Sequence, residues 1–406
     1  MRKSRQAKLL IGLSMGWLLA CGSPADEHAT QTARLLSALR AEAVSERDSA
    51  RQVWPDYFFT AADVPLVQAA LAESYPDDSL RGGDTRRALL EVLAEFPAEI
   101  EAGPLAQVFA ATDSLPRVRG RLLALLAETG QAQTLASLLP LAADDARIDW
   151  AEALTPVPAQ PEVLAALLPQ TKSLLKQPHL APLWVLILAE GLDRGHLAPA
   201  DLTPLADPLL TYGAQIPAGQ AEAQAGFLRL TAHLGRDPRF NQVLGQALAG
   251  GERQLPAIAA CLEVGIPVAD SLIEGLAARA ETRLPLYLLL QQQGQSHRFP
   301  PDFLGPVPMA AADLALWLAR RGHEAGAPEW LATFPLQEQG LLMAFRFRQR
   351  GRWLLGLSGP QPADSSRFET GGYLTGSLMQ PYRAYRLRRD VESYLEQLDA
   401  GYLLAD

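Results

Sequence analysis

The chain has 406 residues, of which 48% are apolar, 45 are acidic and 36 are basic. This length is ample for a buried core, and the net charge of −9 argues against an extended surface for nucleic-acid phosphates. Its two cysteines, Cys21 and Cys261, are too few for a cysteine-rich metal site or a fold held by several disulfides.

Residues 1–20 have the layout of a signal peptide. Four basic residues open the chain, an apolar stretch covers residues 9–19, and Ala20 follows it. The apolar stretch is about a dozen residues long, whereas a transmembrane helix needs roughly 20. We therefore expect a cleaved signal rather than a permanent membrane span.

The run Leu18-Leu19-Ala20-Cys21 ends in one of the two cysteines and resembles the lipobox of bacterial lipoproteins. The resemblance implies that the Cys21 thiol carries a diacylglycerol, that the signal is cut before it, and that the new amino terminus is acylated. In that family Gly22 after the cysteine implies sorting to the periplasmic face of the outer membrane in a Gram-negative cell. The alternative is an ordinary secretory signal with a chance cysteine.

Residues 21–32 are small and polar, which predicts a lipidated N-terminus followed by a flexible tether, with the folded part beginning near residue 33. Because residues 1–20 hold four basic and no acidic side chains, the mature chain keeps 32 basic and 45 acidic residues, a formal charge of −13. An aromatic cluster at residues 54–59 is expected to cap the open end of the first helical repeat or, alternatively, to bind a partner.

Helix is predicted over most of the remaining chain, because Leu, Ala, Gln and Glu dominate and apolar residues recur every three or four positions. The first clear helix is expected at residues 61–73 and the last at 385–398. A representative helix spans residues 115–127. Asp113 and Ser114 are expected to cap its start, and Gly130 follows its end.

Apolar segments that end in glycine recur along the chain. The terminal glycines are Gly130, Gly191, Gly235, Gly265, Gly294, Gly322 and Gly351. From Gly235 onward they lie 30, 29, 28 and 29 residues apart, and the position four residues before each glycine is mostly apolar. One helical pair cannot bury such a stripe alone, but stacked pairs can.

This pattern resembles the HEAT-like α-solenoids. The resemblance implies an all-α fold, an α-solenoid of stacked helical hairpins with repeats of about 30 residues over residues 33–351. Residues 352–406 are expected to form an irregular, arginine-rich capping segment with a terminal helix. A non-repeating helical bundle is the alternative.

Common catalytic and cofactor motifs are absent from the sequence, including HExxH, the phosphate-binding GxxxxGK[ST], GxGxxG and GxSxG. We accordingly expect no catalytic residue, no cofactor and no metal site. Cys261 lies between Ala260 and Leu262 in the apolar column, where a cysteine acts as a small hydrophobic residue.

Nine arginines lie between residues 341 and 389, against only Asp364 and Glu369. These arginines are expected to pair with acidic faces of the preceding repeats and so hold the terminal segment in place. Alternatively, because arginine pairs well with carboxylates and phosphates, an anionic lipid head group, a cell-wall carboxylate or an acidic partner binds here. The candidate binding residues are Arg346, Arg348, Arg350, Arg352, Arg383, Arg386, Arg388 and Arg389. Arginines also alternate with Phe347 near Trp353, as on nucleic-acid platforms, but Phe347 is expected in a helical core.

The function expected from these patterns is a non-enzymatic, lipid-anchored periplasmic scaffold or adaptor that binds another envelope protein, in outer-membrane or cell-wall biogenesis. The alternative is a peptidoglycan-binding or peptidoglycan-processing protein with its site around Glu369. Soluble lytic transglycosylases combine a glutamate with a Gly-Leu-Met-Gln motif, but here Ser377 interrupts the matching run at residues 376–380. A small-molecule carrier is a third alternative.

Overall fold

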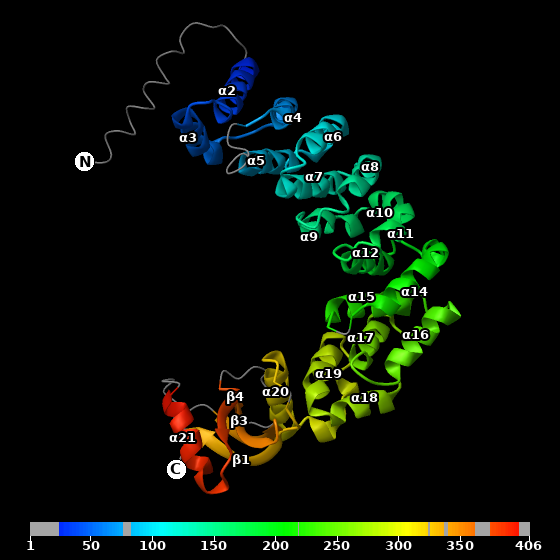
Figure 1. Ribbon diagram of the computed structural model, residues 1–406, viewed down its shortest axis with the longest axis vertical. Helices are drawn as coiled ribbons and strands as arrows, with labels where there is room; N and C mark the ends of the chain where they lie inside the picture. Colours follow the sequence, from blue (N-terminus) through cyan, green and yellow to red (C-terminus); the bar gives the residue numbers. More distant parts are fainter. Residues whose placement is uncertain are drawn as a thin grey trace, which may run out of the picture. The chain divides into compact units, whose positions relative to one another are not determined.

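The computed structural model describes residues 24–75, 83–217, 219–323, 325–336, 340–361 and 374–397. The described part is mostly helical and also contains a four-stranded antiparallel sheet near the C-terminus. The chain divides into two compact units, which meet in the sequence at Pro217 and Ala218. Figure 1 labels their elements.

The first unit is built of helices joined by short loops and 3-10 turns. Its helices are α2 (Pro24–Leu39), α3 (Val44–Val53), α4 (Val64–Ala72), α5 (Gly83–Ala94), α6 (Ala102–Ala111), α7 (Pro116–Glu128), α8 (Ala132–Ala142), α9 (Trp150–Leu154), α10 (Pro161–Leu167), α11 (Thr171–Leu174), α12 (Ala181–Asp193), α13 (Pro199–Leu202) and α14 (Ala206–Gln215).

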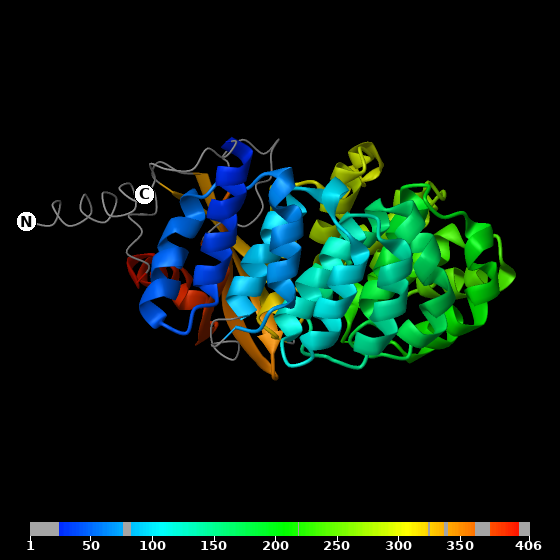
Figure 2. The same cartoon turned by 90° about the horizontal axis from the view of Figure 1, so that it is seen from above.

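These helices form two rows within the first unit. Helices α5, α7 and α9 contact one another in sequence order, and α4, α6, α8 and α10 form the second row. Figure 2 shows the helices of this unit lying side by side in chain order. Neighbouring helices of this unit thus bury their apolar side chains against one another.

Helix α7 shows how the sequence pattern produces this packing. It begins at Pro116, whose missing N–H costs no hydrogen bond there, and Gly130 follows its end with φ +69°. Every residue from Val118 to Ala127 is buried. The predicted helix is confirmed, but the predicted cap is wrong: the N-cap is Leu115, and the carboxylate of Asp113 accepts a hydrogen bond from Arg119 at 2.6 Å.

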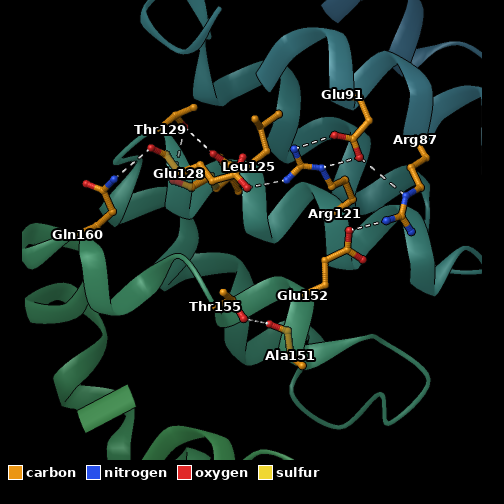
Figure 3. A network of polar contacts seen from close by, with 11 residues as sticks. Arg87, Glu91, Arg121, Leu125, Glu128, Thr129, Ala151, Glu152, Thr155 and Gln160 are labelled. Carbon is orange, nitrogen blue, oxygen red and sulfur yellow. Dashed lines mark hydrogen bonds and ion pairs between the residues drawn. The ribbon is translucent and has the colours of Figure 1, made fainter. Parts of the chain in front are cut away.

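Ion pairs within and between helices link α5, α7 and α9 (Figure 3). The guanidinium of Arg121 on α7 donates to Glu91 on α5 at 3.0 Å and to Glu128 at 2.8 Å, and Arg87 on α5 donates to Glu152 on α9 at 2.7 Å. Burial works against the charged guanidinium, but the hydrogen bonds with Glu128 and Glu91 outweigh it and raise the pKa of Arg121. The row is thus held by charges as well as by apolar contacts.

The second unit begins with helices α15 (Ala221–His233), α16 (Pro238–Leu248), α17 (Gln254–Val264), α18 (Asp270–Ala278), α19 (Ala280–Gln292) and α20 (Pro306–Arg320). Gly265, Gly294 and Gly322 follow α17, α19 and α20 with φ of +80°, +66° and +68°, which only glycine adopts freely. The spacing of about 30 residues coincides with the helix pairs α16–α17 and α18–α19, whereas the interval from Gly294 to Gly322 holds two 3-10 turns and the single helix α20.

After α20 the chain forms a sheet of strands β1 (Glu329–Leu336), β2 (Gly340–Gln349), β3 (Arg352–Gln361) and β4 (Gly376–Pro381), in that order. Each strand pairs antiparallel with the next. A last helix, α21 (Leu387–Gln397), lies within residues 385–398, where the terminal helix is predicted. We call α20, the sheet and α21 the C-terminal module.

The module has three layers (Figure 1). Met343, Phe345 and Phe347 on one face of the sheet pack against α20, whereas Leu342 and Ala344 on the other face pack against Val391 and Leu395 of α21. Successive residues of a strand point to opposite faces, so β2 supplies both cores.

A buried polar cluster joins α20 to the sheet. Asp313, on α20, accepts hydrogen bonds from the hydroxyls of Ser358 at 3.2 Å and Thr375 at 2.7 Å, and the Thr375 hydroxyl accepts one from the backbone N–H of Gly359. All three side chains are buried. Because buried polar groups are costly without partners, this cluster favours a single position of the helix on the sheet.

The sheet corrects the all-α prediction. Residues 343–351 form part of strand β2 and its turn rather than a helix, and residues 352–361 and 376–381, expected to be irregular, form β3 and β4. Gly351 follows the helical spacing by coincidence, because it lies in the β2–β3 turn, where its φ of +79° again favours glycine.

The predicted tether is also wrong in part. Helix α2 begins at Pro24, so residues 24–32 are helical rather than extended. The Thr32 hydroxyl of this helix is buried and donates to Asp63 at 2.7 Å, which ties the segment to the first unit.

Candidate functional site

The candidate site is one end of the C-terminal module, where strands β2 and β3 meet in a tight turn. We call it the arginine-rich end and define it by Arg346, Arg348, Arg350, Arg352 and Arg383. Arg350 and Gly351 both have positive φ, +47° and +79°, as a two-residue hairpin turn of the favoured twist requires.

The alternation of β2 places the arginines. Phe345 and Phe347 point toward α20 and are fully buried, so Arg346 and Arg348 lie on the opposite face. Strand β3 reaches the same end, with Arg348 directly opposite Trp353.

Two aromatic side chains and one acidic side chain surround Arg346. Its guanidinium lies 4.6 Å from the centre of the Trp353 ring and 6.0 Å from that of Tyr382, and its Nη2 lies 2.6 Å from the carboxylate of Glu329 on β1. Arg348 lies 5.9 Å from the same Trp353 ring. Cation–π contacts hold the planar guanidinium groups in defined positions on the sheet.

The end of α20 adds positive charge beside the turn. The backbone N–H of Gly326 donates to the carbonyl of Arg348 at 2.8 Å, and Gly322, His323, Gln349 and Arg350 line a hollow between the helix end and the turn. Arg321 lies over Trp317 at 5.2 Å. A positive side chain at a helix C-terminus is favourable, which explains Arg321 by structure alone.

The four arginines near α21 differ in their surroundings. Arg386 and Arg388 pair with Asp390 and Glu392, each four residues later, at 3.4 and 3.0 Å. Arg383 donates to the hydroxyl of Tyr385 at 3.3 Å, and Arg389 is exposed.

Arg383 is the member of this group that reaches the β2–β3 end. Its neighbour Tyr382 donates its backbone N–H to the carbonyl of Trp353 at 2.8 Å. The structure therefore brings Arg346, Arg348, Arg350, Arg352 and Arg383 together around one end of the sheet.

The described ion pairs of these arginines use Glu329, Asp390 and Glu392, which all lie inside the module. This differs from the expected pairing with acidic faces of the preceding helices. Within the described part of the chain, Arg348, Arg350, Arg352, Arg383 and Arg389 have no ion pair, and all five are exposed. The result is a basic surface on an acidic protein.

Trp353, Tyr382 and Glu329 complete this surface. Sequence reasoning noted Trp353 but placed Phe347 in a helix, and it missed Tyr382 and Glu329. The alternation Phe345-Arg346-Phe347-Arg348 has the period of a strand and is the signal that identifies the arginine face.

The remaining residues singled out in the sequence lie away from the arginine-rich end or outside the described part of the chain. Cys261 is buried in the core of the second unit, where burial raises the pKa of its thiol. Residues 376–380, compared above with the transglycosylase motif, lie in strand β4. Cys21 and Glu369 lie outside the described residues.

The described ranges of the chain contain no group of three or more His, Cys, Asp or Glu side chains that could hold a metal ion. No helix in those ranges combines the length and the apolar character needed to cross a bilayer. Comparison with protein-family models, curated proteins and solved structures finds no match to this chain.

Proposed function

We propose that this chain is a lipid-anchored scaffold of the bacterial envelope whose arginine-rich end binds an acidic partner protein. The anchor is Cys21, as its resemblance to a lipobox implies, on the periplasmic face of the outer membrane. The helical pairs of the two units are proposed to be the repeats of a HEAT-like α-solenoid, and the C-terminal module follows the last pair. The proposal includes no catalytic residue and no cofactor.

The observation that supports this function best is the placement of charge. Arg346, Arg348, Arg350, Arg352 and Arg383 surround one end of the sheet, whereas the mature chain as a whole is acidic. Opposite charges steer two proteins together, and exposed guanidinium groups held on aromatic rings bind carboxylates with little loss of side-chain freedom.

Contacts with aromatic rings distinguish this surface from a cluster of charges that only water surrounds. Trp353 holds Arg346 and Arg348 from one side, and Glu329 neutralises only Arg346. Arg348 and Arg352 thus remain available for acidic groups of a partner.

Crosslinking in cells tests the proposal. A photoreactive residue replaces Arg352 in the full-length protein, and the same residue replaces Arg236 as the control, an exposed arginine without an ion pair in the described helical part of the same unit. We expect a discrete protein adduct from position 352 and none from position 236. The charge reversals R348E and R352E should weaken specific capture of that protein, whereas R236E should not.

The peptidoglycan alternative has a separate outcome. The purified protein and the R348E/R352E variant are each pelleted with isolated peptidoglycan. Pelleting that the variant loses, together with no protein adduct at position 352, favours glycan binding over the scaffold. If neither an adduct nor pelleting is observed, the arginine-rich end has no binding role.

A further inference from the structure

Exposed apolar side chains of the first unit lie near the start of α2, the helix that follows Cys21. We propose that Val53, Trp54 and Phe58, which we call the aromatic corner, enter the interfacial region of the lipid leaflet that holds the anchor. This rests on the proposed lipidation of Cys21, and the experiment below separates the two.

The chain between Cys21 and the first unit is short. Helix α2 begins at Pro24, three residues after Cys21, and three residues span at most about 10 Å even when fully extended. A lipid on Cys21 therefore keeps the start of α2 near the surface of the leaflet. The tether expected from the sequence would have placed the first unit much farther away.

The aromatic corner lies beside the start of this helix. His28 is four residues into α2, about 6 Å along its axis. Its ring stacks on that of Tyr57 with the centroids 5.8 Å apart, and its Nε2 lies 2.8 Å from the carboxylate of Asp63. The segment that carries Phe58 is thus fixed against the part of α2 nearest the anchor.

Phe58 projects outward from a packed cluster. Its neighbours Tyr57 and Phe59 pack edge to face at 4.9 Å, and Trp54 lies 4.9 Å from Phe59, which is buried. Phe58 itself is 80% exposed, and Val53 is 49% exposed. An exposed phenylalanine held by an ordered aromatic base does not cap a helical repeat, which is the role that the sequence pattern predicts for the whole cluster.

The charges around the aromatic corner indicate which kind of lipid surface it contacts. Asp26, Glu27 and Asp56 are exposed around the corner, so attraction to anionic lipids does not favour contact. Tryptophan favours the boundary between headgroups and acyl chains, which suits Trp54, and burial of the apolar Phe58 and Val53 there removes them from water. A leaflet rich in zwitterionic lipid, already close because of the anchor, is the occupant that this geometry supports.

A spin label on residue 58 tests the contact. The F58C variant of the full-length, lipidated protein is labelled with a nitroxide. Labelling is selective because Cys261 is buried and Cys21 carries lipid in the proposed form. The control is L141C, in the same unit, where Leu141 is an apolar side chain 71% exposed on α8. Both proteins are reconstituted with vesicles in which zwitterionic phosphatidylethanolamine predominates over anionic phosphatidylglycerol.

Collisions with oxygen and with a water-soluble nickel chelate give the readout. We expect the label at position 58 to become several-fold less accessible to the chelate and more accessible to oxygen when vesicles are present. The label at position 141 should not change. Protection of residue 58 from both reagents assigns the corner to a protein contact and overturns the proposal, as does unchanged access to the chelate.

Flotation of the same samples separates the two hypotheses. If the protein fails to float with the vesicles, the lipid anchor and the contact that depends on it are both overturned. If it floats while residue 58 stays in water, the anchor holds and the membrane contact alone is wrong.

Discussion

The guanidinium of Arg346 lies 4.6 Å from the centre of the Trp353 ring, one strand away on the same face of the sheet. This relationship depends on the pairing register of β2 and β3, which sets Arg348 opposite Trp353 and Arg346 one diagonal step away. A shift by one residue would move the arginines to the face that packs against α20. The register thus creates the proposed binding surface.

Replacing Trp353 tests this arrangement. W353A should lower the free energy of unfolding of the module by about 2 kcal/mol, because two cation–π contacts and part of the ring's burial are lost. W353Y should cost less than half of that, since it keeps an aromatic face. Faster hydrogen exchange in β2 and β3, with the first unit unchanged, would verify the effect; equal losses in both variants would contradict a role for the ring face.

Arg121 should contribute to the stability of the first unit. It is 8% exposed and donates to both Glu91 and Glu128, so R121M should lower the free energy of unfolding by about 1 to 2 kcal/mol through the loss of these charge-assisted hydrogen bonds. The control is R147M, because Arg147 is 67% exposed and pairs with the nearby Asp145, where solvent screens the interaction and its loss should have little effect. Urea unfolding of the two variants would measure the difference, and similar losses would argue against the cross-helix pairs.

Asp63 should make the first unit sensitive to acid. Burial alone would raise the pKa of its carboxyl, but hydrogen bonds from Thr32, Thr60 and His28 outweigh burial and lower that pKa. Because the folded pKa lies below the unfolded value of about 3.9, the stabilisation is present at neutral pH. This stabilisation begins to be lost as the pH falls below about 4, the pKa of the unfolded chain, and is gone once the pH is below the lowered pKa of the folded protein.

The D63N variant provides the measurement. At pH 7 it should be less stable than the parent protein by about 2 kcal/mol, since the amide accepts fewer of the hydrogen bonds. The difference should shrink as the pH falls from about 4 to about 3, because the Asp63 carboxyl of the unfolded chain then binds a proton more readily than that of the folded chain. Chemical unfolding of both proteins at the two pH values tests this, and a difference independent of pH would show that the charge of Asp63 is irrelevant.

Asp313 should fix α20 on the sheet. D313A leaves the buried hydroxyls of Ser358 and Thr375 without their acceptor and should cost about 2 to 3 kcal/mol. S358A should cost about 1 kcal/mol, because a single donor is removed and the Thr375 contact remains. Hydrogen exchange in α20 and β3 should rise more in D313A than in S358A, and the reverse order would contradict the proposed arrangement.

Local patterns predicted much of the helical part. The stripe in residues 118–126 and the glycine after it place α7 to within a residue, and the column four residues before each repeat glycine is buried from Leu126 to Leu318. These predictions hold where helix period, apolar spacing and the positive φ of a terminal glycine coincide, since all three are local properties. Gly191 is the exception, because it is buried inside α12 and does not end a helix. Cys261 falls in the same buried column for the same reason.

Only the tertiary structure decided the C-terminal module and its basic surface. Gly351 suits a hairpin turn as well as a helix end, so its spacing alone leaves the element undetermined, and Phe347 is buried in either case. The sheet forms because β1 to β4 pair across the intervening chain and bury both faces against α20 and α21. Such nonlocal pairing selects the face of each side chain, and it places Arg346 beside Trp353, Tyr382 and Glu329, a combination that residue spacing does not encode.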